Sequence, residues 1–234
     1  MELFNDDCFN IIKNINHDVK LVCVDLPYGV LKCKWDIPIN IEEMWKQLKS
    51  VCNKQCVYLF FCDMRLAGKL IESNPKDYRY DLVWDKVNNS TGIFAKHKPL
   101  RRHEYVLVFG KKGVYNPQKS YGHSNYPARK SKIVQSTFRF SQPSVSGPCT
   151  DGSRYPTSIM TFKKKKSTKN RHPTQKPTDL LEHLVKQYSN EGDWVLDFTM
   201  GSGSCGVACK NTNRKFIGVE KDPKYFEMAK MNLL

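Results

Sequence analysis

Short apolar runs alternate with amphipathic segments along most of this chain, and that alternation constrains its fold more than any other feature. Runs rich in β-branched and aromatic residues predict strands at 1–5, 21–24, 55–62, 80–84, 105–109, 194–198 and 216–220. Apolar residues at helical spacing predict helices at 8–15, 41–51, 64–73, 178–189, 205–210 and 223–232. Strands that alternate with helices indicate a mostly parallel sheet covered on both faces, so we expect an α/β fold.

The composition narrows the class of protein. With 234 residues, 40% of them hydrophobic, the chain can bury a real core, which argues against wholesale disorder. No apolar run reaches membrane-spanning length, and residues 1–20 are too polar for a signal peptide. Nine cysteines without a C-x-x-C pair favour reduced thiols in the cytoplasm. Zinc is an alternative at Cys52/Cys56 and Cys205/Cys209, but we favour small buried side chains and no metal site.

One predicted strand runs directly into a polar motif. The apolar run at 21–24 is followed by Asp25-Leu26-Pro27-Tyr28-Gly29. Pro27 cannot continue a strand ladder, so Asp25 and Tyr28 are expected at the carboxyl end of the strand, where open α/β sheets bind ligands. A heteroaromatic amino group is a poor nucleophile, and Asp25 and the Leu26 carbonyl can accept its two N–H groups while Tyr28 stacks on the ring. The alternative is an ordinary Asp-Pro turn.

A second predicted strand, at 194–198, leads into a glycine turn and then a helix. Gly201 and Gly203 allow a ligand to approach the backbone closely. Glu220 ends the next predicted strand, where an acid is placed to hold ribose hydroxyl groups. This arrangement predicts a cradle for a nucleotide-type cofactor, with a dinucleotide as the rival ligand.

Residues 111–171 differ from the rest of the chain. They hold 14 Lys and Arg against one acid, so this stretch carries +13 of the net charge of +15. Aromatic residues lie between the basic ones, and no clean periodicity is present. The stretch predicts an irregular insertion with a polyanion-binding face, and a solvated basic loop is the alternative.

Four motifs in this order, DLPYG at 25–29, HPTQKP at 172–177, DFTMGSGS at 197–204 and FIGVEKD at 216–222, resemble the β-class DNA amino-methyltransferases. The resemblance covers about 1–112 and 172–234, so these segments are expected to form the methyltransferase domain. It implies a Rossmann-like sheet of seven strands, a circularly permuted motif order and S-adenosylmethionine as methyl donor. Residues 113–171 would be the target-recognition insertion that binds double-stranded DNA.

The resemblance also implies residue roles. The amino-group pocket would be formed by the catalytic residues Asp25, Leu26, Pro27 and Tyr28. Contacts with the cofactor would come from Asp7, Asp25, Thr174, Lys176, Asp197, Phe198, Gly201, Gly203, Ser204 and Glu220. Contacts with DNA would come from Arg129, Lys130, Lys132, Arg139, Lys163, Lys164, Lys165 and Lys166. A second wall for the base is expected from Trp35 or Trp84, although burial in the core is the favoured interpretation of each.

The function implied is methyl transfer from S-adenosylmethionine to the exocyclic amino group of a flipped DNA base, as in restriction-modification systems. An initial Asp in the motif favours N6 of adenine over N4 of cytosine, and Leu26 in place of the commoner Pro leaves the carbonyl acceptor intact. The alternatives are an N4-cytosine enzyme, a non-catalytic DNA-binding protein on this scaffold, and a methyltransferase of RNA or protein amides. Members of the class often form homodimers, and the expected location is the cytoplasm or wherever host or viral DNA lies.

Overall fold

The computed structural model describes residues 1–29, 37–88, 92, 95–127, 129–130, 145–146, 150–163 and 175–233. The chain divides into two compact units. One consists of Met1–Asn116 with Ser158–Leu234, and the other of Pro117–Thr157. The first unit holds the main sheet, whose strands are β1 (Glu2–Phe4), β2 (Val19–Asp25), β3 (Cys52–Cys62), β4 (Tyr78–Asp85), β5 (His103–Phe109), β8 (Ile159–Thr161), β9 (Trp194–Asp197) and β10 (Lys215–Val219).

The main sheet has the order β1-β10-β9-β2-β3-β5-β4-β8. β5 is antiparallel to both of its neighbours, and every other pairing is parallel. The α/β fold and its mostly parallel sheet are therefore confirmed. The sheet has eight strands rather than the expected seven, because β8 pairs with the edge strand β4. β8 is only three residues long, too short to give a periodic signal in the sequence.

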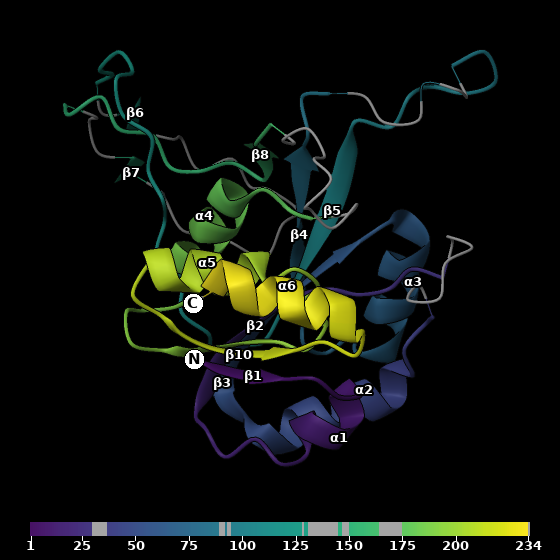
Figure 1. Cartoon of the computed structure of the whole chain (residues 1–234). Helices are drawn as coiled ribbons and strands as arrows, with labels where there is room; N and C mark the ends of the chain where they lie inside the picture. The colour runs from purple at the N-terminus through teal and green to yellow at the C-terminus, as the bar shows by residue number, and fades with distance from the viewer. Residues whose placement is uncertain are drawn as a thin grey trace. The chain divides into compact units, whose positions relative to one another are not determined.

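Helices cover both faces of the main sheet (Figure 1). The apolar sides of α1 (Cys8–Ile12), α2 (Ile41–Val51) and α3 (Met64–Ser73) pack on one face. Those of α4 (Thr178–Tyr188), α5 (Ser204–Asn211) and α6 (Pro223–Leu233) pack on the other. Side chains of Asp7, Asn40 and Asp63 cap α1, α2 and α3 by accepting backbone N–H bonds, which fixes where these helices begin.

α1 is shorter than the helix expected at 8–15. It ends at Ile12, and the chain continues in tight turns in which Asn14 and Ile15 donate N–H bonds to carbonyls three residues back. Those turns keep Ile15 packed against the core, so the apolar residues of 8–15 share one side although the helix ends at Ile12.

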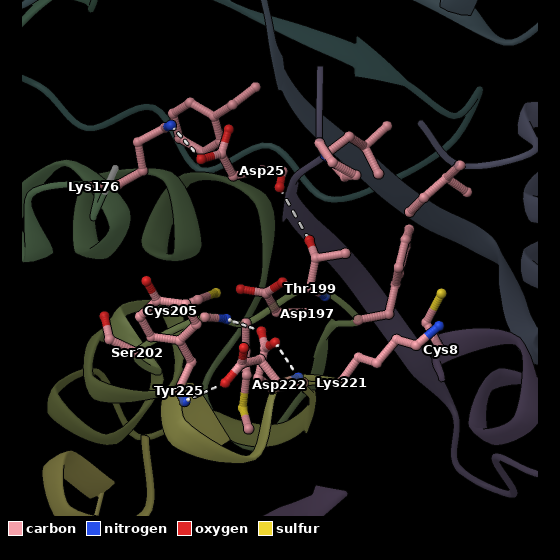
Figure 2. A pocket seen from close by; sticks show the side chains of 18 of the residues that line it. Cys8, Asp25, Lys176, Asp197, Thr199, Ser202, Cys205, Lys221, Asp222 and Tyr225 are labelled. Carbon is pink, nitrogen blue, oxygen red and sulfur yellow. Dashed lines mark hydrogen bonds and ion pairs between the residues drawn. The ribbon is translucent and has the colours of Figure 1, made fainter. Parts of the chain in front are cut away.

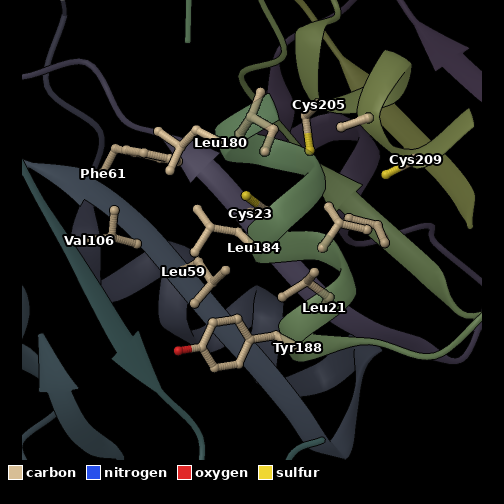
Figure 3. Packing of buried hydrophobic residues seen from close by; sticks show 14 of the residues in the cluster. Leu21, Cys23, Leu59, Phe61, Val106, Leu180, Leu184, Tyr188, Cys205 and Cys209 are labelled. Carbon is tan, nitrogen blue, oxygen red and sulfur yellow. The ribbon is translucent and has the colours of Figure 1, made fainter. Parts of the chain in front are cut away.

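Several cysteines belong to the apolar core between the sheet and α4–α6. Figure 3 shows Cys23, Cys205 and Cys209 among leucine side chains such as Leu184, and all three cysteines are buried. This packing agrees with the interpretation of Cys205 and Cys209 as small buried side chains, and Cys56 is buried as well, whereas Cys52 is only half-buried. Across the described ranges, no cluster of three or more His, Cys, Asp or Glu side chains could hold a metal ion. The same ranges include no helix of the length and apolarity that a bilayer crossing requires.

The second unit contains a small antiparallel sheet of β6 (Arg129–Lys130) and β7 (Val145–Ser146). Within this unit, Arg154 lies over the ring of Tyr126 at 4.6 Å, and Lys119 lies over the ring of Tyr155 at 4.7 Å. Cations thus stack on aromatic rings in the basic stretch.

Gly110, which directly follows β5, tests how tightly the sheet is packed. Its φ is +103°, and an added Cβ would lie 2.3 Å from the backbone oxygen of Cys56. Gly110→Ala is expected to lower the free energy of unfolding by about 3 kcal/mol, measured by urea denaturation.

Gly192 is the matched control, because its φ is +81° and an added Cβ would meet nothing within 4 Å. Gly192→Ala should lose only about 1 kcal/mol, the cost of a left-handed backbone for alanine. Equal losses in the two variants would mean that the contact with Cys56 is not the cause.

Candidate active site

A cavity of about 600 Å³ opens at one edge of the main sheet. Much of its lining comes from four segments that follow β1, β2, β9 and β10, namely 6–9, 25–28, 197–202 and 220–223. These four strands are neighbours and parallel, so their carboxyl ends meet at the same edge. The two predicted sites, the motif at Asp25 and the glycine turn at Gly201, therefore line one cavity (Figure 2).

The end of β2 presents Asp25 with both carboxylate oxygens engaged. Tyr28 donates its hydroxyl to Asp25 Oδ1 at 3.1 Å, and Lys176 Nζ lies 2.5 Å from Oδ2. Thr199, after β9, donates its hydroxyl to the Asp25 carbonyl at 3.1 Å and so joins the two strand ends directly. Burial raises the pKa of Asp25, and the ammonium group of Lys176 opposes that rise.

Two charged residues that the sequence reasoning missed stand behind Lys176. Lys176 Nζ lies 3.3 Å from Glu104 Oε2, and Lys86 Nζ lies 2.5 Å from Glu104 Oε1. Burial raises the pKa of Glu104, but Lys176 and Lys86 together outweigh it and hold this pKa at about 2. A signal was available, because alternation along a strand puts Glu104 on the same face as the core residues Val106 and Val108.

The glycine turn after β9 is tied to the end of β10 through Glu220. The backbone N–H of Gly201 donates to Glu220 Oε2 at 2.9 Å, and that of Asp222 donates to Oε1 at 2.8 Å. Burial raises the pKa of Glu220, against these two N–H bonds. A carboxylate has about four lone pairs, so Glu220 keeps acceptor capacity for a ligand in the cavity. Gly203, with φ +77°, closes the turn as the N-cap of α5, and the residues on either side of it, Ser202 and Ser204, line the cavity.

Asp197, at the end of β9, is the most strongly shifted acid of the cavity. Burial raises its pKa to about 8, against a backbone N–H bond from Thr199. The negative charges of Asp25 and Glu220 add to the rise. These three residues are among seven acids that line the cavity, against two lysines, and this excess of acids suits a cationic ligand.

The raised pKa of Asp197 predicts how stability depends on pH. The folded protein keeps the Asp197 carboxyl group protonated up to about pH 8, whereas the unfolded chain releases that proton near pH 3.8. Stability is therefore lost as the pH rises between these values. Asp197→Asn should flatten that dependence and raise the free energy of unfolding at pH 8 by on the order of 1–3 kcal/mol. Urea denaturation at pH 5 and pH 8 measures the effect. A constant difference between variant and wild type at both pH values contradicts it.

The other predicted cofactor residues lie around the same cavity. Phe198 and Ser204 line it next to the glycine turn. Asp7 also lines it, while its carboxylate caps α1 through the Phe9 N–H at 3.0 Å and lies 3.0 Å from Lys221 Nζ. Thr174 lies outside the described residues. Asp222 and Tyr225 line the cavity without having been predicted, since Asp222 closes the motif FIGVEKD whose predicted contact was Glu220, and Tyr225 lies in α6 outside the four motifs.

The structure describes some of the residues predicted as a wall for the base or as DNA contacts, but not all of them. Trp84 is buried in the core, donates its indole N–H to the Phe162 carbonyl at 2.8 Å, and is also one of the residues that line the cavity. Lys163 is exposed, and Arg129 and Lys130 form β6. The residues that lie outside the described ranges are Trp35, Lys132, Arg139, Lys164, Lys165 and Lys166.

Comparison with known proteins agrees with this arrangement. A family model described as DNA methylase, the N6/N4 methyltransferase family, matches residues 19–231. The type II methyltransferase M1.MboII of Moraxella bovis is 27% identical over 250 residues, which cover 95% of this chain and 92% of the relative.

Two solved structures share the fold. The M1.HpyAVI–SAM complex superposes with a TM-score of 0.68 at 24% identity, over 99% of this chain and 98% of that one. The cytosine-N4-specific PvuII DNA methyltransferase superposes with a TM-score of 0.67 at 13% identity, over 99% and 86%. With the family match over most of its length, the chain belongs to the N6/N4 DNA methylase family.

Proposed function

We propose that this protein transfers a methyl group from S-adenosylmethionine to the exocyclic amino group of a DNA base, most favourably N6 of adenine. The observation that carries the proposal is the hydrogen-bond acceptor Asp25, paired with Lys176 at 2.5 Å, in the lining of a cavity that holds further carboxyl groups. The names of its relatives support the reaction class, since M1.MboII is a type II methyltransferase and M1.HpyAVI was solved with SAM.

The cavity residues suit S-adenosylmethionine by their chemistry. The cofactor carries a sulfonium and an ammonium group, and acidic residues outnumber lysines in the lining of the cavity. Glu220 has acceptor capacity left for ribose hydroxyls, and Phe198 offers an apolar wall. When bound, the cofactor supplies an electrophilic methyl group on its sulfonium.

The chain's own residues would prepare the amino group. Asp25 and the Leu26 carbonyl would accept its two N–H groups, which draws the nitrogen lone pair out of conjugation with the ring. Tyr28, whose hydroxyl is held on Asp25, would face the base. Flipping a base out of the duplex costs a few kcal/mol, which stacking in such a pocket partly recovers. Catalysis would then rest on positioning and on hydrogen bonds to the amino group.

Adenine is favoured over cytosine by the Asp that opens the motif at residue 25. The decisive experiment incubates the protein with S-adenosylmethionine and unmethylated genomic DNA, digests the product to nucleosides and separates them by mass spectrometry. N6-methyladenine is expected. N4-methylcytosine would assign the alternative base, and DNA binding without any methylated nucleoside would favour a non-catalytic DNA-binding protein. Parallel reactions with RNA and protein test the remaining substrates.

The basic stretch is proposed to bind DNA phosphates, and its lysine run at 163–166 gives a test. Replacing these four lysines with glutamine should weaken DNA binding and reduce the slope of log K against log salt, by up to about 3 to 4. Fluorescence anisotropy with a labelled duplex at several salt concentrations measures the slope. A control variant carries four exposed lysines changed to glutamine elsewhere, at Lys13, Lys54, Lys69 and Lys76. An unchanged slope in the 163–166 variant would mean that these lysines do not contact phosphate.

A further inference from the structure

Four buried or half-buried charges form a continuous row that ends on Asp25. In order they are Lys86, Glu104, Lys176 and Asp25, and the successive nitrogen–oxygen distances are 2.5, 3.3 and 2.5 Å. The side chains of Lys86 and Lys176 are each only 7% exposed, and that of Glu104 is 18% exposed. Two cations and two anions alternate, so the row carries no net charge.

The row comes from four separate parts of the chain, of which the end of β2 supplies Asp25. Lys86 directly follows β4, Glu104 lies at the start of β5, and Lys176 precedes α4. Lys86 and Lys176 also lie over aromatic rings, at 5.4 Å from the Trp84 centroid and 5.1 Å from that of Phe61. Glu104 on β5 and the Phe61 ring on β3 therefore contact the Lys176 ammonium group from the sheet.

Such a row is costly as a purely structural device. Removing two lysines and a glutamate from water costs several kcal/mol per ion, and apolar residues of similar volume often stabilise a core better. The row is the part of the core that borders the cavity, since Glu104, Lys176 and Asp25 all line it. Its place at the amino-group pocket points to a role in the reaction rather than in stability.

We propose that Lys176 is a positioning residue for Asp25, held in place by Glu104 and Lys86, and that it keeps Asp25 ionised and fixed in orientation. This inference rests on the proposed function of Asp25 as acceptor of an amino N–H. It gives Lys176 a contact with the catalytic carboxylate rather than the cofactor contact that its motif implied. With Oδ2 bound to Lys176 and Oδ1 to the Tyr28 hydroxyl, the carboxylate plane cannot rotate freely.

The charges around Asp25 predict in which direction each substitution shifts the pKa of Asp25. The titratable groups that act on it are Lys176, Glu104, Tyr28, Asp197, Cys62 and Cys23. Lys176 lowers the pKa of Asp25, whereas Glu104 raises it. Removing the charge of Lys176 must therefore make Asp25 harder to ionise, and removing that of Glu104 must make it easier. A merely structural role would leave the acid limb of the methyl-transfer profile in place, whereas the proposed role makes that limb follow the Asp25 titration.

The first experiment measures single-turnover methyl transfer to unmethylated DNA as a function of pH. Lys176→Met should lower the rate at pH 7 by about 100-fold and move the acid limb of the profile to higher pH. Lys176→Arg keeps the charge and should leave the limb near its wild-type position. Glu104→Gln should move the limb to lower pH. Lys186→Met, an exposed substitution on α4, is the control and should match wild type.

The second experiment reads Asp25 directly and needs no DNA. Protein labelled with ¹³C at the aspartate carboxyl carbon is titrated by NMR, with an Asp25→Asn sample to assign the signal. The Asp25 titration should shift to higher pH in Lys176→Met and to lower pH in Glu104→Gln. If Lys176→Met does not fold, the shift of the Asp25 titration in Glu104→Gln decides. If Glu104→Gln is itself unstable, the double variant Lys86→Met/Glu104→Gln replaces it, because it removes one cation and one anion together.

An Asp25 titration that is unchanged in these variants, or a Lys176→Met rate profile that is only scaled down, would overturn the inference. Failure of the wild-type protein to methylate DNA would instead overturn the proposed function. The two failures are distinguishable, because the NMR titration still reports whether Lys176 controls Asp25.

Discussion

Replacing Asp25 with alanine is expected to abolish methyl transfer to DNA, with a loss of roughly 1,000-fold or more. The variant lacks the side-chain acceptor for one amino N–H, so the nitrogen lone pair stays delocalised in the base. Binding of S-adenosylmethionine should stay within a few-fold of wild type, because the proposed cofactor contacts Asp197 and Glu220 lie at the ends of β9 and β10. A tritium-methyl transfer assay measures the first effect, and isothermal titration calorimetry measures the second.

The matched control for this prediction is Asp81→Ala, since Asp81 is exposed on β4. That variant should methylate DNA at the wild-type rate. Asp25→Asn is informative as well, because its amide oxygen keeps an acceptor but leaves Lys176 with Glu104 alone as its anionic partner. Wild-type-like turnover of Asp25→Ala would refute the assigned role.

The second large effect is expected at Glu220. Glu220→Ala removes both the proposed acceptor for the ribose and the two bonds that hold the backbone of Gly201 and Asp222. Affinity for S-adenosylmethionine should fall on the order of 100-fold, about 2.7 kcal/mol, and saturating cofactor should recover part of the rate. Calorimetry gives the affinity, and the dependence of rate on cofactor concentration gives the recovery.

Two further variants separate the causes of that loss. Glu220→Gln keeps one acceptor oxygen for the turn and should lose less affinity than alanine. Glu227→Ala removes an exposed acid that pairs with Lys230 on α6, and it should leave affinity unchanged. If Glu220→Ala binds the cofactor as tightly as wild type, the cavity does not hold the cofactor against the end of β10.

The features predicted correctly from the sequence are those that local pattern determines. A buried parallel strand is apolar along its whole length, so β2 and β9 stand out as Val- and Leu-rich runs. Asp25 and Gly201 interrupt this pattern where the chain turns, and the rule that ligands bind at carboxyl ends of strands placed both at one edge.

The features missed depend on pairing between distant segments. Nothing near Lys86 indicates that its partner is Glu104, 18 residues later, because the two meet only when β4 and β5 pair in register. Lys176 lies in the motif HPTQKP and was therefore predicted as a site residue, but the motif does not show which group its ammonium contacts. β8 forms a strand because it pairs with the edge of β4. Tertiary contacts of this kind leave no period in the sequence.

The hydroxyl bond from Thr199 to the Asp25 carbonyl spans 174 positions of the chain, and it has a kinetic consequence. Loop closure over such a span is slow, and proteins dominated by contacts distant in sequence reach the native state slowly. During refolding from urea, helical circular dichroism should recover well before the ability to bind S-adenosylmethionine. The cavity needs residues from the ends of both β2 and β9, so binding of S-adenosylmethionine reports that these two distant segments have come together.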